Sequence, residues 1–183
     1  ALCTGVVSYT EFVEIELAEP MEVEKAALAL DAALPRGIRV LAADAVDTHH
    51  AALMSQAAGA SYRITLPYSK DVSVAVAEFN AAPELLFKKA APKTKAKFKE
   101  IDVKFYIPQL TAEQTETETI FSFDCKITPT GSMKAVDLLN ALNEQYGLAL
   151  PVEMADIERL RLYRNNKNGK PIPMLNSDAV TLG

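Results

Sequence analysis

A lysine-rich stretch that runs into a clean alternation does most to limit what this chain can fold into. Residues 88–107 read KKAAPKTKAKFKEIDVKFYI, although the chain as a whole carries a net charge of −5. From Lys99 to Ile107, apolar and polar side chains alternate, which predicts a strand with one buried face. The lysines before it predict a basic, solvated arm that leads into this strand.

The composition places the chain among globular proteins. It has 183 residues, of which 49% are hydrophobic and 23% charged, so one large domain or two small ones can bury a core. No apolar run approaches the roughly 20 residues of a membrane helix. Cys3 and Cys125 are far apart in sequence. We therefore expect each to be a small buried hydrophobe, and we expect a reducing cytoplasm.

Residues 1–46 predict a β-α-β unit. Strands are expected at 10–17 and 38–46, on either side of a helix that Pro20 opens and Pro35 ends. Residues 47–59 form a connector with a short helix. His49 and His50 lie at its start, and adjacent histidines without further ligands make a poor metal site. We predict a structural or solvent role for both.

Residues 60–165 predict a second, larger unit. Helices are expected after Ser69 and Ser132, and residues 111–118 read as a polar connection. The predicted strands are 60–67, 99–107, 119–128 and 157–164. This β-α-β-β-α-β order is that of the ferredoxin-like fold, with the first and third strands central. The fold class is therefore α+β, a ferredoxin-like domain preceded by a half unit of the same kind. Residues 166–183 form a tail that we expect to be loose from Asn176.

Two segments resemble a known family. Residues 10–46, TEFVEIELAEPMEVEKAALALDAALPRGIRVLAADAV, and residues 97–107, KFKEIDVKFYI, are similar to the radical-SAM-linked protein family. This is a domain of unknown function, encoded beside a radical-SAM protein or fused to one. The resemblance implies a non-catalytic accessory or docking domain whose partner is a radical-SAM protein.

The resemblance also bears on residues 1–46. Family members begin with a further strand, a helix with a Ser-His-Leu-Asp motif and another strand, and residues 1–5 resemble the end of that part. The β-α-β unit would then be half of a ferredoxin-like unit. Its sheet edge would be open, so we expect a homodimer or a partner contact there.

The sequence contains no recognisable catalytic constellation. A radical-SAM enzyme needs three cysteines close in sequence to hold its cluster, and this chain has two distant ones. It has no phosphate-binding loop and no hydrolase or metalloprotease motif. We predict no catalytic, cofactor-binding or metal-binding residue, and no membrane partner.

The lysine arm leaves three interpretations open. Lysines neutralise phosphates, Tyr106 could stack a base on an open sheet face, and Lys104 and Arg159 would lie on opposite edge strands. The arm could equally guard a sheet edge or dock a protein. The candidate surface consists of Lys93, Lys95, Lys97, Lys99, Lys104, Tyr106, Arg159 and Arg161. The two hypotheses for function are therefore an accessory docking domain and an RNA-binding module.

Overall fold

The chain divides into two compact units in this computed structural model, which describes residues 4–47, 49–90 and 97–182. The sheet unit consists of Ala1–Glu11 and Ala57–Tyr163, and the small unit consists of Phe12–Gln56 and Arg164–Gly183. Each unit combines helices with strands, so the α+β class is confirmed.

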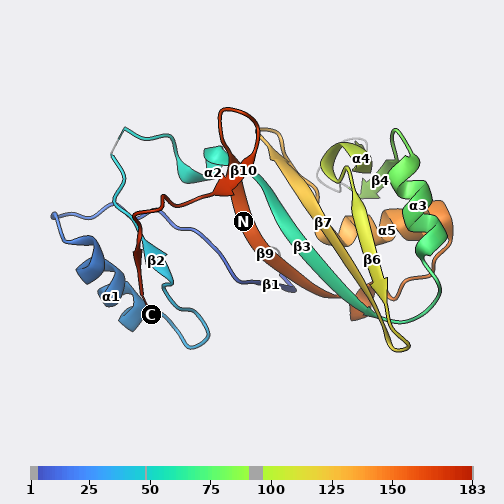
Figure 1. Cartoon of the computed structure of the whole chain (residues 1–183), viewed down its shortest axis with the longest axis horizontal. Coiled ribbons are helices and arrows are strands. Elements are labelled where there is room, and N and C mark those ends of the chain that lie inside the picture. Colours follow the sequence, from blue (N-terminus) through green and yellow to red (C-terminus); the bar gives the residue numbers. More distant parts are fainter. Residues whose placement is uncertain (1–3, 48, 91–96, 183) are drawn as a thin grey trace. The chain divides into compact units, whose positions relative to one another are not determined.

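The sheet unit is built on strands in the order β1-β9-β3-β7-β6. Neighbours are antiparallel in the β3–β7 and β7–β6 pairs, and β1 runs parallel to β9. Its main elements are β1 (Val6–Ser8), β3 (Ala57–Pro67), α3 (Ser73–Ala81), β6 (Leu110–Gln114), β7 (Glu118–Thr128), α5 (Ala135–Tyr146) and β9 (Asp156–Asn165). Figure 1 shows α3 and α5 on the same side of these strands.

The core lies between this sheet and the two helices. On β3, Ile64 and Leu66 are buried and alternate with polar residues, as the sequence predicts. Phe79 of α3 and Leu138 of α5 are fully buried against the same face. Helix α5 ends at Gly147, whose left-handed φ of 59° and N–H bond to Asn143 O close the last turn.

Residues 98–106 form a strand and a helical turn in place of the predicted single strand. β5 (Phe98–Asp102) pairs only with β4 (Leu86–Ala90), and α4 (Val103–Tyr106) follows. The Asp102 carboxylate accepts the N–H of Lys104 at 3.0 Å and caps this turn. Val103 and Ile107 are four residues apart, so one helical face buries both. The alternation fitted a helical turn as well as a strand.

The place of the second predicted strand of the ferredoxin-like unit is instead taken by β6, which overlaps the predicted polar connection at residues 111–114. Leu110 is buried, and Thr111 and Glu113 face solvent. Because β1 pairs with β9, the last predicted strand is also not the edge of the sheet. Short elements complete the unit, namely β8 (Gly131–Ser132) and the 3-10 turn η1 (Val152–Met154).

The small unit keeps the predicted helix but not its flanking strands. α1 (Val23–Ala33) forms where the sequence predicts it, whereas residues 10–17 have no regular structure. A strand needs a neighbour for its backbone groups, and residues 38–46 find one only at β2 (Ala42–Ala43), which pairs with β11 (Val180–Thr181). The predicted loose tail therefore includes a paired strand. The other elements are α2 (Leu53–Gln56) and β10 (Pro171–Pro173).

Candidate functional site

The β4–β5 hairpin presents the described part of the lysine arm. Lys88 lies opposite Glu100, Lys89 opposite Lys99, and Ala90 opposite Phe98. Lys97, Phe98 and Lys99 are exposed, and the Phe98 ring keeps 60% of its surface in solvent. An exposed aromatic ring between two lysines offers a stacking face beside positive charge. Lys93 and Lys95 lie outside the described residues.

Buried side chains fix the base of this hairpin against the rest of the sheet unit. Phe87 and Ile101 face each other across the hairpin and are both buried in the core. The ammonium of Lys89 donates to Asp137 Oδ2 of α5 at 2.8 Å, in a half-buried ion pair. Lys89 is thus a structural lysine, Lys88 lies opposite Glu100, and Lys97 and Lys99 are exposed.

Lys104 and Tyr106 do not join the hairpin lysines. The Lys104 ammonium donates to Pro108 O at 2.5 Å and lies 4.6 Å from the centre of the Phe79 ring. Burial lowers the pKa of Lys104. Tyr106 packs against the core and meets Phe105 edge-on at 5.1 Å. Because both residues lie on α4, the predicted edge-strand lysine and the predicted stacking ring of the open sheet face are wrong.

Arg159 and Arg161 lie on β9, but each has a local partner. Arg159 is only 6% exposed, and its Nε donates to Glu11 Oε1 at 2.9 Å. Arg161 is exposed, donates to Ser61 Oγ at 2.8 Å and lies 5.6 Å from the Tyr163 ring centre. The predicted place of Arg159 on an edge strand is wrong, since β1 covers that side of β9.

A carboxylate also balances Arg63, a further arginine of this sheet. Arg63 of β3 lies 3.6 Å from Glu158 of β9, and Glu158 accepts the Tyr9 hydroxyl at 2.5 Å. The Tyr9 pKa is raised by this hydrogen bond, because the bond and the neighbouring charge disfavour the phenolate. Arg63 and Arg159 of the sheet are thus each paired with a carboxylate, whereas Lys97 and Lys99 of the hairpin are exposed. Of the predicted basic residues, those on the hairpin are best placed to meet a polyanion.

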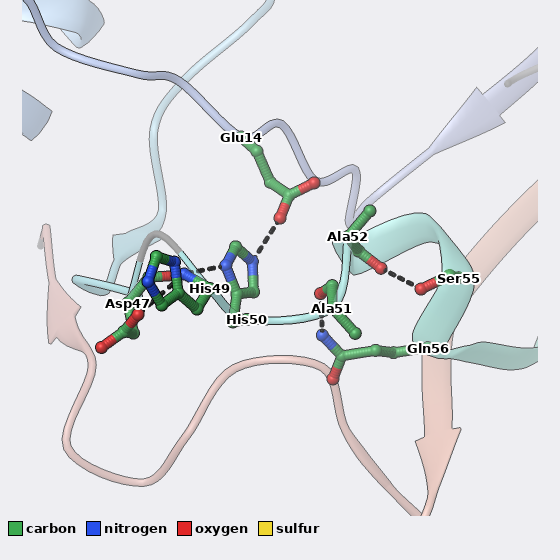
Figure 2. Close-up of polar contacts among 8 residues, drawn as sticks. All are labelled: Glu14, Asp47, His49, His50, Ala51, Ala52, Ser55 and Gln56. Carbon is green, nitrogen blue, oxygen red and sulfur yellow. Dashed lines mark hydrogen bonds and ion pairs between the residues drawn. The ribbon is translucent and has the colours of Figure 1, made fainter.

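A histidine–carboxylate contact organises the first half of the small unit, as Figure 2 shows. His50 Nε2 lies 2.5 Å from Glu14 Oε1, and its Nδ1 lies 2.7 Å from Asp47 O. The Asp47 carbonyl, followed by the Glu14 carboxylate, raises the pKa of His50 because both favour the imidazolium. Both ring nitrogens are occupied, so His50 holds two segments together, in agreement with the structural role predicted for it.

Metal ligation has no basis in the described residues. Within residues 4–47, 49–90 and 97–182, no group of three or more His, Cys, Asp or Glu side chains is arranged to hold a metal ion. The Cys125 thiol is buried under the sheet, and burial raises its pKa to about 11. The predicted burial of Cys125 is thus confirmed, and Cys3 lies outside the described residues.

Sequence reasoning missed an apolar surface on the small unit. Val13, Ile15 and Leu17 are 71%, 54% and 47% exposed, although their alternation predicts a buried strand face. Further large apolar residues of this unit are also exposed, namely Met21, Leu28, Ile38, Leu41, Val46 and Met54. The alternation was the signal that could have identified this surface, because it marks side chains that need a cover.

The described residues form an α+β protein. Residues 1–138 match the model of a family described as an uncharacterized protein conserved in bacteria (DUF2344), and the chain belongs to this family. No curated protein and no solved structure matches the chain. None of the helices in the described ranges is long and apolar enough to cross a membrane.

Proposed function

We propose that this chain is a non-catalytic accessory domain that docks onto a radical-SAM protein. The partner follows from the resemblance of residues 10–46 and 97–107 to the radical-SAM-linked family. With two distant cysteines, the chain depends on a partner for any cluster chemistry. The docking role rests on one observation, the exposed apolar surface of the small unit.

The small unit exposes many large apolar side chains and buries few apolar residues. In the small unit, the buried apolar residues within the described ranges are Ala27 and Met174. Val13, Ile15, Leu28 and Leu41, by contrast, are each more than half exposed. Isolated apolar residues are common on surfaces, but a concentration in one unit is typical of an interaction site. A partner that covers these side chains would supply the core that the unit lacks.

The docking proposal is tested by mixing the chain with a radical-SAM protein from the same genome and measuring the mass of the eluting species by light scattering. We expect a complex. Leu41→Lys, which places a charge on the apolar surface, should abolish it, whereas Val74→Lys on the exposed face of α3 should not. Two separate peaks at concentrations of about 10 µM, well above the Kd of a stable interface, would contradict docking.

A second candidate function, RNA binding, is favoured by Phe98. Its exposed ring lies between Lys97 and Lys99 at the start of β5, where base stacking and phosphate neutralisation could act together. The ferredoxin-like topology proposed for the sheet unit is supported by the strand order β9-β3-β7-β6, with β3 and β7 central. Several RNA-binding modules use folds of this kind. RNA would then be the material that the docked complex presents or modifies.

The RNA proposal is tested by fluorescence anisotropy with a short structured RNA across a salt series. Glutamate at Lys93, Lys95, Lys97 and Lys99 should collapse the affinity, and Phe98→Ala should weaken it at every salt concentration. Each phosphate contact should contribute about −0.7 to −0.9 to the slope of log affinity against log salt. The matched control places glutamate at four exposed lysines elsewhere, Lys25, Lys134, Lys167 and Lys170. Equal loss in both quadruple variants, or no binding at low salt, would contradict it.

A further inference from the structure

Residues 12–17, FVEIEL, form an acidic segment whose backbone and apolar face are both unpaired. In the part of the chain that the structure describes, no backbone hydrogen bond joins this segment to another. The apolar side chains Val13, Ile15 and Leu17 are exposed on alternate positions. Unpaired backbone groups beside an apolar face are what a β-strand offers before it joins a sheet.

The opposite face of the acidic segment is already held in place. Glu14, which alternates with Val13 and Ile15, accepts His50 Nε2 at 2.5 Å. The loop that carries His50 is in turn fixed by Asp47, whose carbonyl meets His50 Nδ1 and whose carboxylate accepts the His49 N–H at 2.7 Å. Figure 2 shows Glu14 reaching from its segment to this ring. The contact with His50 uses the face of the segment that carries Glu14, so the face that carries Val13, Ile15 and Leu17 remains exposed.

The outer edge of the main sheet is formed by β6. At Leu110, the first residue of β6, side-chain contacts block pairing with a further strand. The Asn80 side chain donates to Leu110 O at 2.8 Å and accepts the Leu110 N–H at 2.9 Å, so it occupies the position of a neighbouring strand on β6. Gln114 at the other end of β6 is likewise bonded to Lys70 O and to the Val72 N–H. The acidic segment has no comparable side-chain contact to its backbone among the described residues.

Charge indicates what the added strand must look like. From residue 10 to residue 24 the chain carries six glutamates and no lysine or arginine. Glu11 is paired with Arg159 and Glu14 with His50, so the remaining charge comes from Glu16, Glu19, Glu22 and Glu24. Two copies of the acidic segment paired with each other would bring glutamates face to face, which is destabilising. A strand that alternates apolar and basic side chains would instead match both the apolar face and the charge.

We propose that residues 12–17 complete a β-sheet with a strand of a partner protein in which apolar residues alternate with lysine or arginine. This rests on the proposed docking function and names the site at which docking occurs. Backbone hydrogen bonds along the segment provide affinity, and Val13, Ile15 and Leu17 enter apolar positions of the partner. Glu16 and the glutamates that follow the segment select a basic strand over an acidic one, since Glu14 is already engaged by His50.

The probe is a fluorescein-labelled peptide of alternating valine and lysine, titrated with the full chain and read by anisotropy. The matched probe alternates valine and glutamate. We expect the basic peptide to bind and the acidic one not to bind. Ile15→Lys should weaken binding at least about tenfold, because it removes a buried apolar contact and repels the probe. Val74→Lys, an equally exposed position on α3, should leave binding unchanged.

Three results would overturn the inference. The first is equal binding of both peptides, and the second is unchanged binding by Ile15→Lys with a native circular dichroism spectrum. The third is a homodimer in light scattering that Ile15→Lys dissolves, since a second copy would then be the occupant. A radical-SAM complex lost in Leu41→Lys but kept in Ile15→Lys would place docking elsewhere on the small unit. Peptide binding without any such complex would instead contradict the docking function alone.

Discussion

Gly59 of β3 lies directly against the ring of Tyr163 on β9. A Cβ added at Gly59 would overlap the hydroxyl and the ring of this buried tyrosine. Overpacking of a core position costs about 1–3 kcal/mol. We expect Gly59→Ala to lower the free energy of unfolding by this amount in urea titrations.

A double-mutant cycle separates this overlap from a general backbone effect. In a Tyr163→Leu background the ring is gone, so Gly59→Ala should cost clearly less than it does in the wild type. The same cost in both backgrounds would show that Tyr163 does not limit position 59.

Cys125 provides a pH-dependent prediction. Burial raises the pKa of its thiol from 9.0 to about 11, so the folded state keeps the proton at pH values where the unfolded state loses it. The stabilisation is complete below pH 9 and is lost as the pH rises toward 11.

The burial of Cys125 that underlies this prediction is tested by iodoacetamide labelling of a Cys3→Ser variant, in which Cys125 is the remaining cysteine. We expect no labelling of the native protein at pH 8 and rapid labelling in urea. Labelling of the folded protein as fast as a free thiol would refute the burial of Cys125.

At the scale of elements, the edge strand β6 depends on one amide side chain. Asn80 satisfies both backbone groups of Leu110, a residue that is almost fully buried. Asn80→Ala leaves a donor and an acceptor without partners, and a buried unpaired group costs about 1–3 kcal/mol. Thermal or urea unfolding should show a loss of this size.

The control for this substitution is Asn140→Ala on the exposed side of α5. It should change stability by less than about 0.5 kcal/mol, because it removes no bond to a buried group. Equal effects at the two positions would mean that the Asn80 contacts do not stabilise β6.

Elements with a strong local signal could be predicted from the sequence. Strands β3, β7 and β9 and helices α1 and α5 form where alternation, helical spacing and end signals coincide. Residues 103–107 could not be assigned, because burial of Val103 and Ile107 is compatible with both a strand and a helical turn. β6 was missed because its polar outer residues resemble a loop, and its pairing with β7 is a long-range contact.

The sequence predicts the basic residues of the candidate site correctly only where no other group of the protein engages the basic side chain. The exposed lysines of the hairpin follow from composition, whereas Lys89, Lys104 and Arg159 are engaged by Asp137, Pro108 and Glu11, respectively. Such contacts depend on tertiary packing, which a charge pattern does not contain. The sequence therefore identifies basic residues but not which of them are free.

At the scale of the whole molecule, one unit has a core and the other has an exposed apolar face. Most of the buried side chains belong to the sheet unit, and the alternation of Val13, Ile15 and Leu17 finds no neighbour among the described residues. The predicted strand with a buried face is therefore wrong for this segment, because no neighbouring strand among the described residues pairs with it. This is why we regard the small unit as the docking half of the protein.

Amide hydrogen exchange of residues 12–17 tests this account most directly. In the isolated chain these amides should exchange rapidly, because no backbone partner protects them. Addition of the radical-SAM protein should slow their exchange strongly while the amides of β3 and β7 remain as they were. Unchanged exchange along residues 12–17 in a mixture that forms a complex would contradict docking through the acidic segment.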